Sequence, residues 1–185
     1  TVVTAEDNST KTYTVTVTRA ASANANLSAL SLTAGALVPV FAPGTTAYTI
    51  SVPNATATTT VTPTVSDANA TVTVNGTTVA SGGTSGSIPL NVGTNTVTTV
   101  VTAQDNSTKT YTVTITRAAS TVATLSNLTI SSGTLNPVFA SGTTDYTVSV
   151  TNPIGAVTVT PTATDPTATI TVNGTTVASG TASGP

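Results

Sequence analysis

Apolar and polar side chains alternate along most of the chain. In residues 10–19, Tyr13 and the alternate valines that follow it share one face of an extended segment, and threonines occupy the other. A period of two is typical of a strand with one buried and one solvated face. Residues 1–5 predict a second strand, and Glu6-Asp7-Asn8-Ser9 between them has the residue types of a turn. The pattern predicts a hairpin over residues 1–19 that needs partner strands, because an isolated hairpin is only marginally stable.

The same alternation continues through the rest of the chain, and no segment has the spacing of an amphipathic helix. Asn75-Gly76 and Asn173-Gly174 each separate two alternating segments, which predicts two-residue hairpin turns with positive φ angles. Pro63 and Pro161 interrupt strand patterns at equivalent places, so each marks an edge strand or a bulge. Turn signals about every ten residues predict seven or eight strands per unit, the pattern of a β-sandwich.

An internal repeat organises the chain. Residues 1–22 return as residues 99–120, 98 positions later, and the copies differ only at Glu6 versus Gln104 and Val17 versus Ile115. Self-similarity at a fixed period indicates an array of one structural unit. A unit of this length suits a sandwich that buries its own core, whereas solenoid repeats of about 20 to 50 residues cannot.

The repeat predicts three segments. Residues 1–22 are expected to be the C-terminal hairpin of a preceding repeat, residues 23–120 a complete β-sandwich, and residues 121–185 an incomplete following repeat. Two explanations of the ends stay open. The chain is a window on a long tandem array, which we favour, or the hairpin of one subunit completes the open sandwich of the next by strand addition.

The core of the complete unit is expected to be the inward face of every strand. Its predicted members are Leu30, Leu32, Phe41, Tyr48, Ile50, Val72, Val74, Val101, Tyr111, Val113 and Ile115.

Composition narrows the class of function. Four basic and six acidic residues give a net charge of −2, which leaves no basic surface for nucleic acid or anionic lipid. Cysteine and histidine are absent, so the thiol nucleophile, the usual general base and the common zinc ligands are missing. No apolar run is long enough to span a membrane. Threonine and valine are abundant, and these β-branched residues favour ordered strands over disorder.

The acidic residues that occur in both copies are the pairs Asp7/Asp105 and Asp67/Asp165. Each lies in a predicted turn, where aspartate most often bonds its own backbone. A calcium site needs six to eight oxygen ligands, more than two carboxylates per unit supply. We therefore predict no catalytic, cofactor-binding or metal-binding residues, and expect chelation to leave the melting curve unchanged.

The cations are Lys11, Lys109, Arg19 and Arg117, one lysine and one arginine per repeat. They are expected to be solvated residues near strand ends and dispensable for folding. The alternative, an intramolecular cross-link from lysine to asparagine, requires a buried acid beside the lysine, and lysine is usually exposed.

Four motifs together carry a family resemblance: LSALSLTAG or LSNLTISSG, FAPGTTAYTISV or FASGTTDYTVSV, ATVTVNGTTV, and NVGTNTVTTVVTAQDNSTKTYTVTITR. The combination resembles the bacterial cadherin-like β-sandwich repeat of secreted and cell-surface proteins. The resemblance covers nearly the whole chain. It implies tandem all-β domains of the immunoglobulin/cadherin-like kind, located outside the cell, and it supplies no catalytic residues.

Two functions are consistent with these observations. The first is a structural repeat of an extracellular bacterial surface or matrix protein, an elongated stalk or filament whose partners are copies of itself. The second is a non-catalytic adhesion module that recognises a glycan or a surface protein. Glycan sites usually present exposed aromatic rings, and the tyrosines and phenylalanines are mostly in core phase, which favours the first. An enzyme is not expected.

Overall fold

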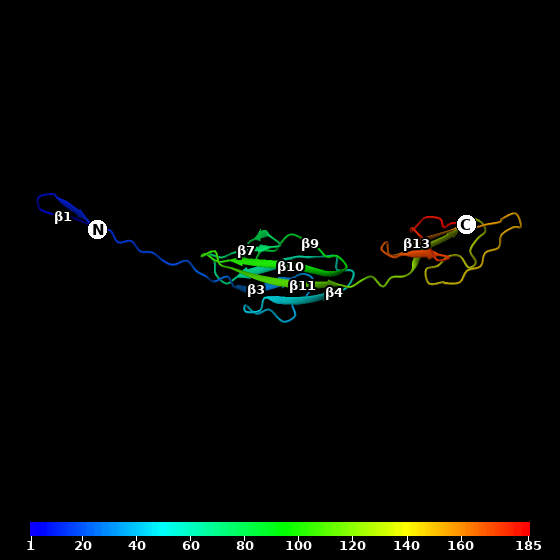
Figure 1. Ribbon diagram of the computed structural model, residues 1–185, viewed down its shortest axis with the longest axis horizontal. Coiled ribbons are helices and arrows are strands. Elements are labelled where there is room, and N and C mark those ends of the chain that lie inside the picture. The colour runs from blue at the N-terminus through cyan, green and yellow to red at the C-terminus, as the bar shows by residue number, and fades with distance from the viewer. The chain divides into compact units, whose positions relative to one another are not determined.

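The computed structural model describes residues 1–185, and its regular elements are all β-strands (Figure 1). The chain divides into two compact units, Thr1–Ala119 and Ser120–Pro185, called unit 1 and unit 2 below. The predicted all-β fold is therefore confirmed.

Unit 1 contains a short hairpin followed by a sandwich. The hairpin strands are β1 (Val2–Thr4) and β2 (Thr10–Thr12). The sandwich strands are β3 (Leu27–Leu32), β4 (Ala47–Val52), β5 (Thr58–Thr59), β6 (Val61–Val65), β7 (Thr71–Val74), β8 (Thr77–Val79), β9 (Ile88–Pro89), β10 (Gly93–Thr102) and β11 (Thr108–Arg117). The count exceeds the expected seven or eight because β5 and β9 are two-residue strands.

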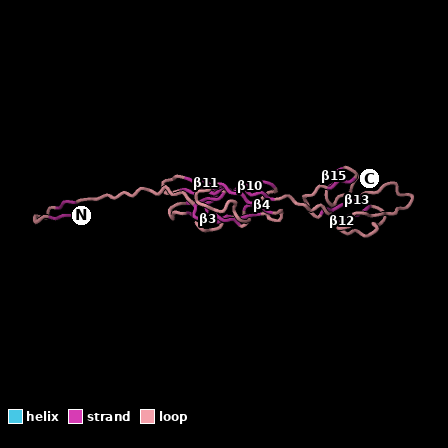
Figure 2. The backbone as a smooth tube through the Cα atoms, turned by 90° about the horizontal axis from the view of Figure 1, so that it is seen from below, coloured by secondary structure: helices cyan, strands magenta, loops and turns pink.

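Five sandwich strands form one sheet in the order β4-β11-β10-β7-β8, and the pairs β3-β6 and β5-β9 complete the sandwich. Figure 2 labels β3, β4, β10 and β11 of this sandwich. In the large sheet only β4 and β11 are parallel, and the other neighbours are antiparallel. Side chains from the sheet and from β3 and β6 pack into one hydrophobic core. The alternation in each strand produces this arrangement, because alternate residues point to one face.

The predicted core of unit 1 is confirmed with one difference. All of the named residues are buried except Phe41, which is half-buried and packs against the core. The Phe41 ring stacks on Tyr48 with centroids 6.0 Å apart and tilts against Tyr111 at 6.4 Å. Phe41 thus covers the two buried tyrosines from the rim.

Local turn chemistry matches the sequence. Asn75 and Gly76 have φ angles of 46° and 82°, and Asn173 and Gly174 have φ angles of 49° and 81°. Glycine and asparagine tolerate this left-handed conformation, which a two-residue hairpin turn requires. Pro63 lies in β6, which pairs with β3 alone, and β3 is irregular between Leu27 and Ala29.

The N-terminal hairpin is shorter than the sequence predicts. Strand β2 ends at Thr12, and residues 13–22 form no strand. Tyr13 is 52% exposed and Val17 is 88% exposed, so the predicted buried face of residues 10–19 is in solvent. The prediction of a full hairpin over residues 1–19 is wrong at this end. In unit 1 the corresponding residues 111–117 pair with residues 93–99 of β10, and residues 112–117 also pair with β4. Residues 13–19 have neither partner.

Unit 2 has four strands: β12 (Leu125–Ile130), β13 (Val159–Ala163), β14 (Ile170–Val172) and β15 (Thr175–Val177). Strand β12 pairs with β13, and β14 pairs with β15, in the same registers as β3-β6 and β7-β8 of unit 1. Residues 145–150, the counterpart of β4, form only a single bridge from Thr147 to Asn136. Unit 2 therefore repeats the N-terminal two-thirds of the sandwich without the strand pair equivalent to β10 and β11.

Candidate interaction surface

The first pair of acidic residues closes identical turns. The Asp7 carboxylate accepts hydrogen bonds from the Ser9 amide at 2.9 Å and the Ser9 hydroxyl at 2.7 Å. Asp105 binds Ser107 in the same way, at 2.9 and 2.6 Å. The serine hydroxyl, followed by the serine amide, lowers the pKa of each aspartate, because both donors stabilise the charged form. These carboxylates serve the turn, as the sequence predicts.

The second pair lies in the turn after β6 and after β13. Asp67 accepts from the Asn69 amide at 2.9 Å, and Asp165 accepts from the Thr167 amide at 2.8 Å. The Ser22 hydroxyl is the largest cause of the lowered pKa of Asp67, and the Ser120 hydroxyl has that role for Asp165. Both serines precede the first strand of their sandwich. Each aspartate therefore interacts with the segment that precedes the first strand of its sandwich, β3 or β12.

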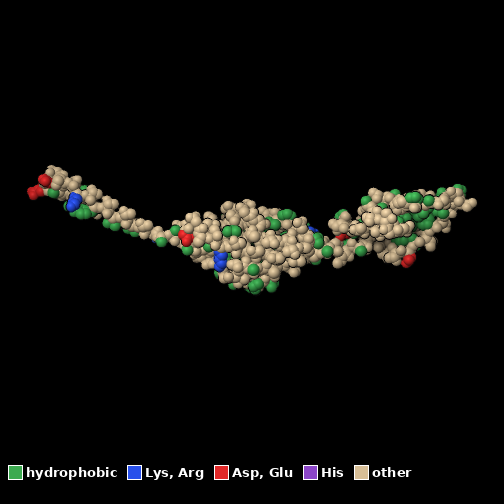
Figure 3. Space-filling model, in the orientation of Figure 1, with side chains coloured by type: hydrophobic (Ala, Val, Ile, Leu, Met, Phe, Trp, Pro, Cys, Tyr) green, Lys and Arg blue, Asp and Glu red, His purple; other side chains and the backbone are tan.

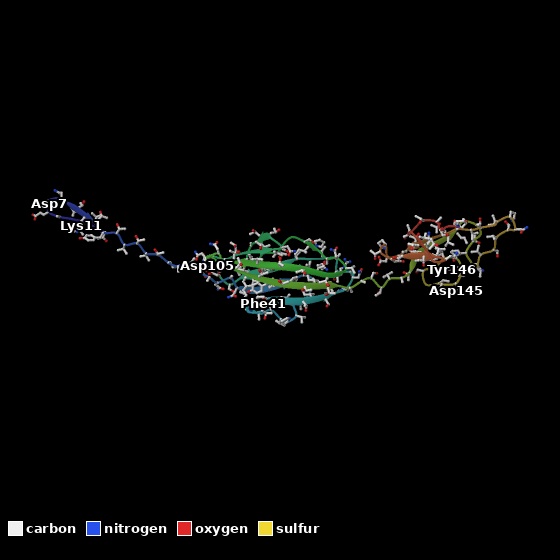
Figure 4. The ribbon with its side chains drawn as sticks, in the orientation of Figure 1. Asp7, Lys11, Phe41, Asp105, Asp145 and Tyr146 are labelled. Atoms are coloured by element: carbon white, nitrogen blue, oxygen red, sulfur yellow. The ribbon has the colours of Figure 1, made fainter.

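The acidic residues do not converge. The structure has no group of three or more carboxylate, histidine or cysteine side chains that could hold a metal ion. Asp7 and Asp105, labelled in Figure 4, lie in separate turns at different places along the chain. The acids that recur in both repeats are each committed to a local turn.

The cations of the complete sandwich differ from expectation. Lys109 Nζ donates to Asn26 Oδ1 and to the Pro43 carbonyl, both at 2.8 Å. Arg117 donates to the carbonyls of Asn54 at 2.8 Å and Leu90 at 2.7 Å. The expectation of solvated strand ends is wrong for these two, which are half-buried and tie β11 to loops of the sandwich. The expectation of solvated residues is consistent with Lys11 and Arg19, which are exposed.

The Lys109–Asn26 contact has the geometry of a hydrogen bond to a charged ammonium group. Lys109 Nζ also lies 5.3 Å from the centroid of the Tyr111 ring, within the range of a cation–π contact. A cross-link to asparagine requires a buried acid beside the lysine. The groups that contact Lys109 Nζ are an amide oxygen, a backbone carbonyl and an aromatic face, and no acid is among them. The contact is therefore a structural hydrogen bond.

An apolar hollow recurs in both units. In unit 2 it measures about 400 Å³ and includes Leu128, Leu135 and Phe139 in its lining. In unit 1 the equivalent hollow, about 230 Å³, is lined by Leu30, Leu37 and Phe41 among others. Val40 and Val138, exposed by 85% and 84%, stand at equivalent rims. The lining has no ionisable side chain, so the hollow suits contact with an apolar surface rather than chemistry.

Unit 2 presents further apolar surface where unit 1 has a closed core. Leu125, Leu128 and Ile130 of β12 are half-buried, and the equivalent side chains of β3 are buried. Tyr146, labelled in Figure 4, is half-buried, whereas its counterpart Tyr48 is 2% exposed. Figure 3 shows hydrophobic side chains gathered on the visible face of unit 2.

Residues 13–19 carry apolar side chains in solvent. Tyr13 is 52% exposed and is the one exposed aromatic residue, whereas the other tyrosines and both phenylalanines are buried or half-buried, as expected for residues mostly in core phase. Val15 and Val17 follow it on the same side of an extended chain, exposed by 85% and 88%. Alternation does not predict this exposure, because the same pattern occurs in β11, where the equivalent positions are buried.

No helix in the structure is long and apolar enough to cross a membrane. A family model, the Cadherin-like beta sandwich domain, matches residues 27–118 and again residues 125–185. A search of curated proteins found none that matches the chain.

Proposed function

The chain belongs to the cadherin-like β-sandwich domain family, and from this premise we propose that it is a structural repeat of an extracellular bacterial surface or matrix protein. Domains of this family are generally non-catalytic and typically extracellular. In the proposed role, tandem sandwiches form an elongated stalk or filament, and the partners are further copies of the same unit, joined end to end or by strand donation.

One observation carries the proposal: the recurring charged side chains of the complete sandwich make hydrogen bonds within the fold. Asp67 and Asp105 accept turn hydrogen bonds, and Lys109 and Arg117 donate to carbonyls of other segments. The outward side chains of the strands are mostly threonine, whose hydroxyls neither titrate nor attract counterions. Such a surface keeps its properties as salt and pH vary, which suits a protein outside the cell.

A second function, adhesion to a glycan or surface protein, draws support from two features. The exposed Tyr13 ring offers a stacking surface, and the hollow beside Val40 and Val138 recurs in both units. In this alternative the chain is a non-catalytic recognition module.

Light scattering and electron microscopy of the 185-residue chain over a range of concentrations test the first function. We expect elongated assemblies that grow with concentration. Compact monomers that bind a defined glycan on an array would overturn the structural proposal in favour of adhesion. A chain that assembles and gives no array signal above a denatured control would support the structural role.

A further inference from the structure

The chain enters the sandwich of unit 1 beside one end of β11. The Ser22 carbonyl accepts from the Asp105 amide at 3.1 Å, and the Ser22 amide donates to Gln104 Oε1 at 3.2 Å. The Leu27 amide, at the start of β3, donates to the Tyr111 hydroxyl at 3.0 Å. The incoming segment is therefore held at the turn between β10 and β11 and at the first half of β11.

The chain leaves the sandwich from the other end of β11. Arg117, the last residue of this strand, donates to the carbonyls of Asn54 and Leu90 at 2.8 and 2.7 Å. The next residue, Ala118, donates from its amide to the Val52 carbonyl at 2.9 Å and accepts at its own carbonyl from the Asn54 side chain at 3.1 Å. The ten residues of β11 span roughly 30 Å, at about 3.3 Å per residue, and they separate entry from exit (Figure 1).

Tension between entry and exit is therefore directed along β11. Residues 112–117 pair in parallel with residues 47–52 of β4, and the whole of β11 pairs with β10. A pull on Ala118 along the strand loads the hydrogen bonds of both ladders together, because β11 has to slide past both neighbours before either ladder opens. This direction of pulling is called shear below.

Strand β3 is loaded in shear from the opposite end. Its first residue, Leu27, lies at the entry, and its last residue, Leu32, bridges to Gly35, which lies against the Ile50 side chain of β4. Ile50 pairs with Ile115, close to the exit. Strand β3 thus runs from entry to exit like β11, and a pull on its N-terminal end slides it along its partner β6.

We propose that the sandwich of residues 23–118 is a load-bearing element, which resists tension along the chain through shear of β11 against β4 and β10, with Arg117 as the anchor of the exit end. This inference rests on the proposed structural role, in which tandem units transmit force along a stalk or filament. It adds a mechanical function to that role. The guanidinium group suits the anchor, because its hydrogen bonds are charge-assisted and the side chain is half-buried.

The direction of pulling provides the first test, by single-molecule force spectroscopy of the 185-residue chain. The chain has no cysteine, so pairs of introduced cysteines attach handles at chosen places. Ala20→Cys with Ala119→Cys pulls in shear, and Ala55→Cys with Ala119→Cys separates the neighbouring ends of β4 and β11. All three alanines are exposed. At one pulling speed we expect the unfolding force to be at least about twofold higher in shear, because the second geometry opens the β4-β11 ladder one pair at a time.

Arg117→Met provides the second test. Methionine keeps an unbranched apolar side chain and removes both hydrogen bonds, so at constant force in shear we expect unfolding to be roughly 10-fold faster. Urea denaturation confirms that the variant is folded and measures its loss of equilibrium stability.

Val79→Ala is the matched control. Val79 packs against the core from β8, and β10 and β7 lie between β8 and β11 in the sheet. The substitution lowers equilibrium stability without altering the sheared ladders. Because β8 is still in place when β11 slides, the unfolding rate at the same force should change by less than about twofold.

The outcomes separate the mechanical function from the proposed assembly, because single chains are pulled. Equal forces in the two geometries, or a higher force in the second, overturn the load-bearing role. Unfolding of Arg117→Met that is no faster than that of Val79→Ala overturns the role of Arg117 as anchor. A chain that resists shear and stays monomeric in light scattering supports the load-bearing sandwich and overturns the filament.

Discussion

Residues 1–22 and residues 99–120 differ at two positions and adopt different structures. In both, the Asp-Asn-Ser turn is the same: Asn8 and Asn106 have φ angles of 67° and 70°, and the aspartate accepts the same two hydrogen bonds. After the turn the copies diverge. Strand β11 continues to Arg117, whereas β2 ends at Thr12.

The divergence follows from partners rather than from side chains. Tyr111 and Val113 are exposed by 0% and 1%, because β4 and β10 flank their strand and β3 covers it. Tyr13 and Val15 carry the same chemistry at 52% and 85% exposure. Turn geometry is therefore encoded locally, and the extent and burial of the strand depend on the rest of the sandwich.

The largest expected difference in stability comes from replacing the tyrosine of each copy. Tyr111→Ala should destabilise unit 1 by about 3 to 5 kcal/mol, the usual cost of removing a buried aromatic side chain. Tyr13→Ala should leave the unfolding free energy of unit 1 unchanged, because that ring is outside the sandwich. Urea denaturation of both variants measures the difference. An unchanged midpoint for Tyr111→Ala would contradict the burial of this residue.

The lysines give the next comparison. Lys109→Met removes two hydrogen bonds from a half-buried ammonium group, and we expect a loss of about 1 kcal/mol in unit 1 after allowance for solvent exposure. Lys11→Met, in the exposed copy, should have no measurable effect on that transition. Equal effects from the two substitutions would show that the bonds to Asn26 and Pro43 contribute nothing.

Removing a buried hydroxyl should raise the stability of unit 1 by a similar amount. Thr99 is fully buried, and its Oγ1 has no hydrogen-bond partner. Thr99→Val keeps the shape and removes the unsatisfied group, so it should stabilise unit 1 by about 1 kcal/mol. Thr1→Val, at the equivalent exposed position, is the control and should change nothing. Calorimetry of both variants distinguishes a gain from a loss.

The smallest effect concerns pH. The pKa values of Asp7, Asp67, Asp105 and Asp165 are lower in the folded chain, so these carboxylates add stability above the unfolded value of about 4 and lose it as pH falls through the folded value. We expect a flat melting temperature from about pH 8 to 5 and a shallow decline below 4, since the groups are exposed. Asp105→Asn should reduce the decline in unit 1. A fall between pH 7 and 5 would require another titrating group.

The sequence predicted the features that depend on alternation within a strand and on local turn chemistry. The inward faces of β3, β4, β7, β10 and β11 and both Asn-Gly turns are confirmed. It could not predict that Lys109 reaches Asn26, because that contact joins residues 83 positions apart. Nor could it predict the exposure of Tyr13, since an alternating pattern states which residues share a face and leaves open whether another strand covers that face.

Hydrogen exchange of the two copies within one chain tests the central claim most directly. If partner strands decide the structure of this segment, amides of residues 112–116 should be protected, because β11 pairs with β4 and β10. Amides of residues 14–18 should exchange freely at a concentration at which the chain is monomeric. Equal protection of residues 14–18 and residues 112–116 under these conditions would contradict the account.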